Sequence, residues 1–434
     1  TTAQTGRTGK GHIGFRIWDG PDWGREFPDV VIKDLKLTEI IPQEVEDDPL
    51  EAVVLTTEEM TVLMDNRFPS VYEYQIGGKT VAGQRAQLRT VTLNGAEYYA
   101  ANVQVTSRSD NTVEYSLDVL DATAFEPYPA QPEECGVLAS LKIGFTAEAL
   151  KLRMDVLEIA EQGDFLVRTI AFPGQYFGTV KNSGGYTEAQ ARMTTLTTAY
   201  GGISESSVLL SANPSGSWYG AYAVIHDDSF AVTMESNVIE TTRKVLVETK
   251  TEGSDSYMAL TNGAWTYRGP GNDDYWGTEE LPWAVVALTG DCNGDQKVDW
   301  QDGAIRYREM AVRPLGSDEM KNYISYIFMN CMSGASMPFM RQLDTIKTMY
   351  NYYDGFGQMI LEKGYNGEGH DDVLYDLVGH VNERAGGEED FQYLLARAKD
   401  FNAKIGVHIN VNEYTLDSFF LDDQYLYKPL QGGW

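Results

Sequence analysis

The feature of this 434-residue chain that most constrains its fold is a long series of short segments, from about Phe15 to Leu288, in which polar and apolar residues alternate. Such segments, rich in β-branched and aromatic residues, predict strands. Two pairs of them flank Gly77-Gly78 and Asn94-Gly95, which are residue types that a tight hairpin turn needs. The series includes Tyr72–Ile76, Lys79–Val81, Leu88–Leu93, Glu97–Tyr99, Val113–Val119, Leu138–Phe145, Leu150–Ile159, Tyr222–His226, Phe230–Met234, Val245–Thr249 and Tyr257–Leu260.

So many strands without intervening helices favour a large antiparallel double-sheet sandwich. Hydrophobic residues make up 42% of the chain, which is enough apolar surface for a core of that size. We therefore predict that residues 1–288 form one large β-sandwich region. A second β module within the same span is the alternative.

After Leu288 the pattern changes to strands that alternate with helices. One predicted helix has Ser336 as its N-cap and Pro338 in its first turn, and the next spans Glu388–Asn402 with acidic residues at its start. The three predicted strands around them are Ser325–Asn330, Gln358–Tyr365 and Lys404–Asn410.

Strand, helix, strand, helix, strand in this order predicts parallel βαβ units. A (β/α)8 barrel is our first interpretation and a doubly wound sheet is the second. A complete barrel takes roughly 250 residues, and residues 318–434 are fewer than half of that. We therefore expect the first three βα strands of an incomplete barrel in residues 318–434, with residues 289–317 as a connecting segment.

The charge of the chain argues against a nucleic-acid partner, and its hydropathy argues against a transmembrane segment. The chain has 34 basic and 64 acidic side chains, a formal charge of -30. Such a field repels the phosphates of nucleic acids, so nucleic acid is an unfavoured partner. No run of apolar residues approaches the roughly 18 that a transmembrane helix needs, so no transmembrane segment is predicted.

The sharpest local motif is the twelve-residue stretch from Asp291 to Asp302. Oxygen-bearing side chains fall at positions 1, 3, 5, 9 and 12, the spacing of an EF-hand-type calcium loop, and the position 7 carbonyl of Lys297 would add a backbone oxygen. Gln296 replaces the usual Gly at position 6, and an acidic surface turn is the alternative. The oxygen-bearing residues are Asp291, Asn293, Asp295, Asp299 and Asp302.

A second group of polar residues follows the three βα strands, where this fold class carries its active sites. The first strand ends at Asn330-Cys331, the second leads into His370-Asp371-Asp372, and the third ends in His408-Ile409-Asn410. The alternative is structural, with His408 as a hydrogen-bonded core residue and the two aspartates as helix caps. The chain has no Gly-x-Ser-x-Gly, Gly-Lys-Ser/Thr or His-Glu-x-x-His motif, so serine hydrolase, nucleotide and zinc-protease interpretations lose support.

The region from Asp291 to Trp434 resembles the catalytic region of endo-α-N-acetylgalactosaminidases, glycoside hydrolase family 101. The preceding β region looks like the family's large sandwich, of the galactose-mutarotase type. Six stretches look like the family's motifs in their order. They are Lys297–Ile305, Gly364-Tyr365, Glu368–Asp371, Gly386–Phe391, Gly406–Asn410 and Gly433-Trp434.

The resemblance implies a secreted or cell-surface, bacterial-type retaining enzyme that removes the disaccharide Gal-β-1,3-GalNAc (core 1) from Ser or Thr of mucin-type O-glycoproteins. It implies that Asp371 contacts a substrate sugar and that His370, His408 and Asn410 line the same pocket. The implied cofactor is calcium, held by Asp291, Asn293, Asp295, Lys297 and Asp302.

A retaining glycosidase needs two carboxyl groups about 5 to 5.5 Å apart. In the family the nucleophilic Asp and the acid/base Glu lie on later strands, past the point that matches Trp434. The resemblance therefore implies that this chain alone is inactive and that the remainder of the barrel comes from a longer chain or a second polypeptide. The alternatives are a non-catalytic carbohydrate-binding or adhesin-type β protein, and a doubly wound α/β domain unrelated to glycans.

Overall fold

The computed structural model describes residues 48–84, 86–124, 128–129, 131–182, 188–197, 202–269, 279–330, 336–366 and 380–409. These residues belong to two compact units, of which the first ends at Val312 and the second begins at Arg313. Among the described residues, no helix is long and apolar enough to cross a membrane. Predicted strand residues before Asp48 lie outside the described part of the chain.

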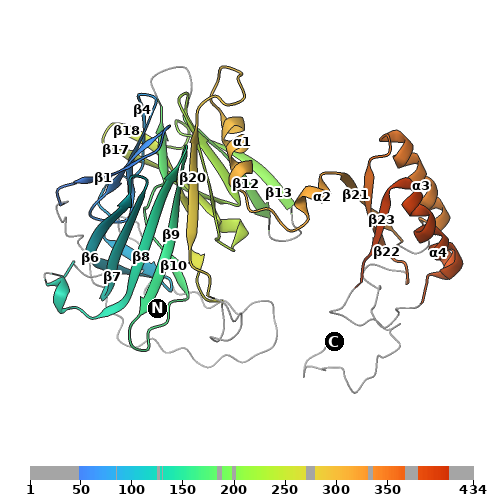
Figure 1. Cartoon of the computed structure of the whole chain (residues 1–434), viewed down its shortest axis with the longest axis horizontal. Coiled ribbons are helices and arrows are strands. Elements are labelled where there is room, and N and C mark those ends of the chain that lie inside the picture. Colours follow the sequence, from blue (N-terminus) through green and yellow to red (C-terminus); the bar gives the residue numbers. More distant parts are fainter. Residues whose placement is uncertain are drawn as a thin grey trace, which may run out of the picture. The chain divides into compact units, whose positions relative to one another are not determined.

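The first unit contains two large antiparallel sheets, coloured blue to yellow in Figure 1. The smaller sheet has eight described strands. In spatial order they are β1 (Ala52–Thr56), β2 (Thr61–Asp65), β3 (Val71–Ile76), β4 (Lys79–Ala82), β11 (Gly178–Lys181), β18 (Asp255–Asn262), β17 (Val245–Glu252) and β14 (Gly216–Gly220).

The larger sheet has twelve described strands. In spatial order they are β13 (Gly202–Leu209), β12 (Gln190–Thr197), β15 (Tyr222–His226), β16 (Ala231–Ser236), β20 (Trp283–Thr289), β9 (Lys151–Glu161), β8 (Val137–Glu148), β7 (Thr112–Thr123), β6 (Ala96–Ser109), β5 (Thr90–Leu93), β10 (Thr169–Ala171) and β19 (Trp265–Thr266). The predicted double-sheet sandwich is confirmed by these two sheets.

One hydrophobic core joins the two sheets. It contains large side chains that are fully buried, such as Phe145 of the larger sheet and Met64 of the smaller one. The Tyr115 hydroxyl of the larger sheet bridges to the smaller one by donating to the Asp65 carbonyl at 2.9 Å, and the Tyr74 hydroxyl donates within the smaller sheet, to the Phe177 carbonyl just before β11, at 2.7 Å. Each buried hydroxyl therefore has the partner that burial requires.

Both predicted hairpin turns are present. Gly77 and Gly78 connect β3 to β4 with φ of +56° and +80°, and Asn94 and Gly95 connect β5 to β6 with φ of +54° and +79°. Positive φ at both central residues is the type I′ geometry that matches the twist of antiparallel strands. The two dipeptides therefore fix the register of their hairpins.

Helix α1 (Trp300–Met310) packs on the larger sheet next to β15, β16 and β20. Gly303 lets the helix approach closely, since a Cβ there would lie 2.4 Å from a Val224 methyl group. The Tyr307 hydroxyl donates to the buried Glu235 carboxylate, and its ring lies 4.3 Å from the ring of Tyr222. The segment after the predicted calcium loop is therefore anchored to the sandwich.

The second unit contains a parallel sheet in the order β21 (Tyr323–Met329), β22 (Gly357–Lys363), β23 (Ala403–Val407). It also contains helices α2 (Ser317–Met320), α3 (Phe339–Tyr352) and α4 (Gly387–Ala398), drawn in orange and red in Figure 1. Short 3-10 helices in the two units are η1 (Pro132–Glu134), η2 (Thr241–Arg243), η4 (Glu383–Ala385) and η5 (Lys399–Phe401). The predicted βαβαβ order is confirmed, and its continuation as a (β/α)8 barrel stays a prediction.

Several predicted boundaries in this unit are wrong, including the end of the third strand, since β23 ends at Val407 and not at Asn410. Pro338, not Ser336, is the N-cap of α3, because the Ser336 hydroxyl donates to the Met329 carbonyl at 2.8 Å and is tied to the end of β21. Strand β22 ends at Lys363, because the next residue, Gly364, has a φ of +97°, which lies outside the extended conformation of a strand. Helix α4 ends at Ala398 and tightens into η5.

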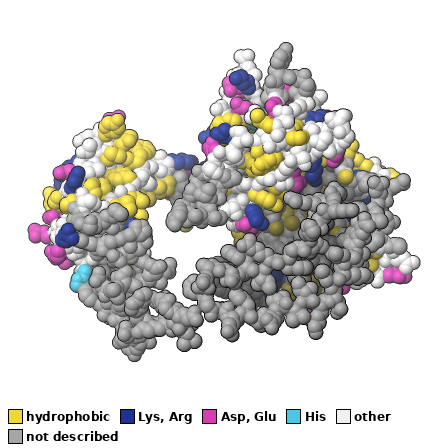
Figure 2. Space-filling view, turned by 180° about the vertical axis from the view of Figure 1, so that it is seen from behind, with side chains coloured by type: hydrophobic (Ala, Val, Ile, Leu, Met, Phe, Trp, Pro, Cys, Tyr) yellow, Lys and Arg dark blue, Asp and Glu magenta, His cyan; other side chains and the backbone are white. Residues whose placement is uncertain are grey.

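The parallel sheet is covered differently on its two faces. Phe328 and Ile360 are buried in a core with residues of α3 and α4. On the other face, Ile327 is 54% exposed and Met329 43% exposed. Exposed hydrophobic side chains are visible on the surface of this unit in Figure 2.

Candidate functional site

The predicted calcium loop lies between β20 and α1 and is folded around its own side-chain oxygens. The Asp291 carboxylate accepts the backbone N–H groups of Gly294 at 2.7 Å and Gln296 at 2.8 Å. The Asn293 amide oxygen accepts the N–H of Asp295 at 3.0 Å, and the Asp295 carboxylate accepts the N–H of residue 297 at 2.9 Å. Alternate side chains therefore turn toward the inside of the loop, as the spacing predicts.

Asp302 fastens the loop to the start of α1. Its side chain is fully buried and accepts the backbone N–H groups of Cys292 at 2.8 Å and Asp299 at 2.9 Å. Asp299 is the N-cap of the helix, so the two aspartates form a capping box. Burial alone would raise the pKa of Asp302, but backbone N–H groups, including those of Asp299 and Cys292, outweigh it and hold this pKa below its usual value.

Only some of the side-chain oxygens in this loop are available to coordinate a hard cation. Asp291, Asn293 and Asp295 are exposed and offer oxygens, the ligand that calcium prefers. Asp302, the predicted last ligand, already uses both carboxylate oxygens as hydrogen-bond acceptors. Within the described residues, no three His, Cys, Asp or Glu side chains converge on a point that could hold a metal ion. A calcium ion would therefore rest on the first half of the loop and on the Lys297 carbonyl.

A hollow of about 440 Å³ adjoins this loop, and His226 lies at its wall. His226 is 1% exposed, and neither ring nitrogen has a hydrogen-bond partner among the described residues. Burial lowers its pKa, against the opposing charge of Asp299. The sequence places His226 at the end of the predicted strand Tyr222–His226. No local pattern predicts that this strand end lies next to the loop.

A buried polar cluster lies at the carboxyl ends of β21 and β22. Glu362 is fully buried, and its carboxylate accepts the Asn330 side-chain amide at 3.1 Å and that of Gln342, in α3, at 3.2 Å. Burial raises the pKa of Glu362 to about 7, although both of these hydrogen bonds oppose the shift. The Asn330 side chain also bonds both backbone groups of Met337 and so holds the segment that leads into α3.

The predicted sugar-binding residues lie at the same edge of this sheet or beyond the described residues. His408 directly follows β23, and its backbone N–H donates to the Glu362 carbonyl at 2.9 Å. Because the three strands are parallel, Asn330, Lys363 and His408 all lie at their carboxyl ends. His370, Asp371 and Asn410 lie outside the described residues.

Comparison with known proteins assigns both parts of the chain. Residues 55–300 match the family model of the galactose mutarotase-like fold domain, and residues 301–434 match that of endo-alpha-N-acetylgalactosaminidase. Residues 301–434 belong to the endo-alpha-N-acetylgalactosaminidase family, and the larger part before them is a galactose mutarotase-like fold domain. A Renibacterium salmoninarum protein that carries the name of this enzyme is 31% identical over 411 residues, which are 89% of this chain and 26% of that protein. The chain thus spans about a quarter of the length of this relative.

Solved structures that resemble the chain are more distant in sequence. The α-N-acetylgalactosaminidase NagBb of Bifidobacterium bifidum, in its GalNAc complex, aligns over 85% of this chain and 60% of its own, with 11% identity and a TM-score of 0.46. A galactose mutarotase related enzyme of Lactobacillus acidophilus aligns over 57% of this chain and 100% of its own, with 8% identity and a TM-score of 0.30.

The sequence motifs indicate the loop and the polar strand ends of this chain but do not indicate Glu362. A glutamate inside the predicted strand Gln358–Tyr365 carries no signal of its own, because strands routinely place such residues on a solvated face. Its burial becomes apparent only when α3 covers that face of the sheet.

Proposed function

We propose that this chain is part of a retaining, endo-acting glycoside hydrolase that releases Gal-β-1,3-GalNAc from Ser or Thr of mucin-type O-glycoproteins. The observation that supports it best is the match of residues 301–434 to the endo-alpha-N-acetylgalactosaminidase family, over a segment whose described strands are parallel. In a parallel α/β domain, side chains at the carboxyl ends of the strands form the ligand site. The enzyme would act outside the cell, as a secreted or surface protein, where mucin glycoproteins are found.

The chain's contribution in this proposal is to bind and orient the sugar. Asp371 would accept hydrogen bonds from a sugar hydroxyl, while His370, His408 and Asn410 would complete the pocket. A charge-assisted hydrogen bond of this kind is stronger than a neutral one, so Asp371 carries the largest share. The nucleophilic Asp and the acid/base Glu would come from strands that follow those of this chain.

We also propose that calcium binds the loop between β20 and α1. Asp291, Asn293 and Asp295 would supply side-chain oxygens and Lys297 its carbonyl, and the bound ion would supply rigidity at the end of the sandwich. Asp302 would hold the loop in place through its hydrogen bonds to backbone N–H groups. The neighbouring carboxylates repel one another without an ion, so binding would relieve that repulsion.

Replacement of Asp371 tests the proposed function. In a full-length enzyme that includes the later strands, Asp371→Asn should lower kcat/KM on a core 1 aryl glycoside by about tenfold or more, or about 1.4 kcal/mol. Glu389→Gln, at an exposed position in the first turn of α4, is the matched control and should leave the kinetics unchanged. Wild-type kinetics in the Asp371→Asn enzyme would assign this residue to a helix cap instead.

A further inference from the structure

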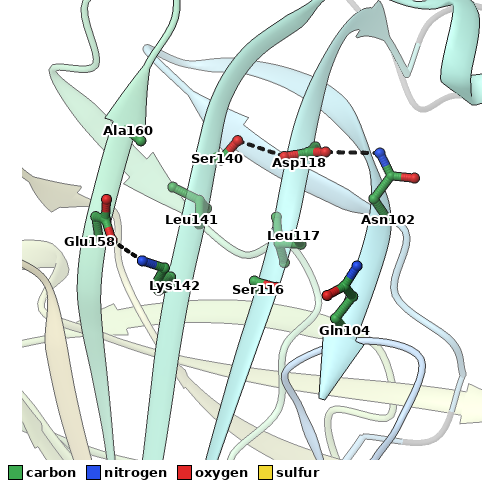
Figure 3. Close-up of a pocket in the computed structure, with 10 residues that line it drawn as sticks. All are labelled: Asn102, Gln104, Ser116, Leu117, Asp118, Ser140, Leu141, Lys142, Glu158 and Ala160. Carbon is green, nitrogen blue, oxygen red and sulfur yellow. Dashed lines mark hydrogen bonds and ion pairs between the residues drawn. The ribbon is translucent and has the colours of Figure 1, made fainter. Parts of the chain in front are cut away.

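We infer that the open face of the larger sheet carries a second, non-catalytic carbohydrate site, which binds one sugar unit of the glycan. This inference rests on the proposed function for the identity of the ligand. The site is a hollow of about 190 Å³ across β6, β7, β8 and β9, shown in Figure 3, and is named the sheet hollow below. Its polar lining comprises Asn102, Gln104, Ser116, Asp118, Ser140, Lys142 and Glu158.

Two β-bulges shape the sheet hollow. The pairing of β6 with β7 shifts between Ala101 and Gln104, where Asn102 has a φ of +55°, and the pairing of β8 with β9 shifts between Lys142 and Ile143. A bulge bends its strand and redirects side chains, and a non-glycine residue with positive φ carries a steric cost. The surface between the two bulges is therefore not a flat, regular sheet face.

One carboxylate in the sheet hollow is held in a fixed position. Asp118 accepts the Asn102 side-chain amide at 2.8 Å on one oxygen and the Ser140 hydroxyl at 2.6 Å on the other, so the three residues link three adjacent strands. These hydrogen bonds are drawn as dashed lines in Figure 3. Each oxygen keeps a further lone pair, so Asp118 presents an oriented acceptor before any ligand arrives.

Two other side chains in the sheet hollow are available to a ligand. Gln104 and Ser116 lie beside this network, and neither side chain has a hydrogen-bond partner among the described residues. The Gln104 amide both donates and accepts, and the Ser116 hydroxyl does the same. A sugar hydroxyl also donates and accepts, so adjacent hydroxyls on one ring fit this combination of groups.

The charges of the sheet hollow disfavour other ligands. Its one cation, Lys142, forms an ion pair with Glu158, which leaves the Asp118 carboxylate as the remaining charge in the lining. An anion such as phosphate would therefore be repelled. No metal-binding cluster of three ligands exists in the described part of the chain, and the two leucines of the lining, Leu117 and Leu141, are buried in the core. A neutral, hydroxyl-rich ligand remains.

Direct binding measurements on the 434-residue chain test this inference. The probes are free N-acetylgalactosamine and Gal-β-1,3-GalNAc, titrated by calorimetry and by ligand-observed NMR. The double variant Gln104→Ala/Ser116→Ala removes both available groups, and Ala160→Trp fills the sheet hollow without removing a hydrogen bond. We expect each to weaken binding of at least one probe tenfold or more. Thr146→Ala, on the exposed face of β8 outside the sheet hollow, should bind as the wild type does.

The outcomes separate this inference from the proposed function. The inference is overturned if the wild-type chain binds neither probe up to about 10 mM, or if both hollow variants bind normally while Asp371→Asn abolishes binding. Thermal unfolding of every variant must match that of the wild type, and Ala160→Trp provides a second test if the double variant unfolds early. Hydrolysis by the longer enzyme is measured separately, so a failure of the proposed reaction would leave the binding result intact.

Discussion

The two β regions of this chain bury their strands in different ways. In the sandwich, strands such as β7 point alternate residues into one core shared by both sheets, and the residues between them are more exposed. In the parallel unit, β21 has the sequence Tyr-Ile-Ser-Tyr-Ile-Phe-Met, which is apolar on both faces. Parallel sheets normally have both faces covered, and for this reason their strands are apolar throughout.

Only one face of the parallel sheet is covered by described residues. Phe328 is 4% exposed against the helices, while the neighbouring Ile327 is 54% exposed. Apolar surface of this kind marks a site that other structure covers. The described strands of the sandwich therefore cover their own core, whereas the described residues of the parallel unit leave one apolar face of its sheet open.

The largest expected effect is a difference in stability between one core side chain of the sandwich and one on the uncovered face of the parallel sheet. Phe145→Ala, in the centre of the sandwich core, should lower the free energy of unfolding by about 3 to 5 kcal/mol because it leaves a cavity. Ile327→Ser, on the uncovered face, should cost no more than about 0.5 kcal/mol. Urea unfolding of both variants, with Thr146→Ala as the surface control, measures the difference. Equal losses would show that the uncovered face is packed in solution.

The second effect concerns Glu362, the buried carboxyl group of the parallel unit. Its pKa is raised from 4.5 to about 7, so below pH 4.5 it is protonated in both the folded and the unfolded chain. As the pH rises from about 4.5 to about 7, the unfolded chain ionises first and the folded unit loses roughly 3 kcal/mol of stability. Above pH 7 the loss is complete.

Glu362→Gln should remove that pH dependence, since a neutral amide keeps the same shape without a charge. Hydrogen-exchange protection of the β22 amides at pH 5 and pH 8 provides the measurement, and Glu389→Gln is the exposed control. Identical pH profiles for the wild type and Glu362→Gln would contradict the assignment. Sandwich amides should not follow this profile in either protein.

The third effect concerns calcium binding to the loop between β20 of the sandwich and α1. Chelation should lower the melting temperature of the wild type, and Asp295→Asn should melt at the chelated value with or without calcium. Chelation should lower the free energy of unfolding by about 2.7 kcal/mol, relative to protein with calcium a hundredfold above its Kd. A wild type that melts identically in excess chelator, with no calcium found by elemental analysis, would rule out the site.

Asp302→Asn separates the structural role of this loop from ion binding. The substitution removes a buried carboxylate that accepts three backbone N–H groups, so it should cost about 1 to 3 kcal/mol even in chelator. Asp295→Asn should cost nothing under those conditions. If Asp302→Asn were also neutral in chelator, the carboxylate would act mainly as a calcium ligand.

The smallest effect tests a hairpin turn of the sandwich. Gly95 has a φ of +79°, so Gly95→Ala should cost about 1 to 2 kcal/mol through backbone strain alone, because no atom would obstruct the new methyl group. Gly290→Ala is the control, since that glycine also has open space but no positive φ. Equal stability of the two variants in urea unfolding would mean that the turn does not hold the register.

Local features of both regions could be predicted from the sequence, but long-range pairing could not. The hairpins at Gly77-Gly78 and Asn94-Gly95 follow from residues that are adjacent in the chain. By contrast, β11 pairs with β4 through Thr179 and Ala82, and no local pattern specifies a partner so distant. The polar cluster around Glu362 escaped prediction for the same reason, because its partners come from separate elements.

We propose that this chain contributes sugar binding, and not the catalytic carboxyl pair, to an endo-α-N-acetylgalactosaminidase. The most direct measurement is the release of Gal-β-1,3-GalNAc from a core 1 aryl glycoside. We predict no turnover by the purified 434-residue chain, and turnover by a longer polypeptide that adds the following strands of the barrel. Turnover by the 434-residue chain alone would place the catalytic pair within these residues and would overturn this proposal.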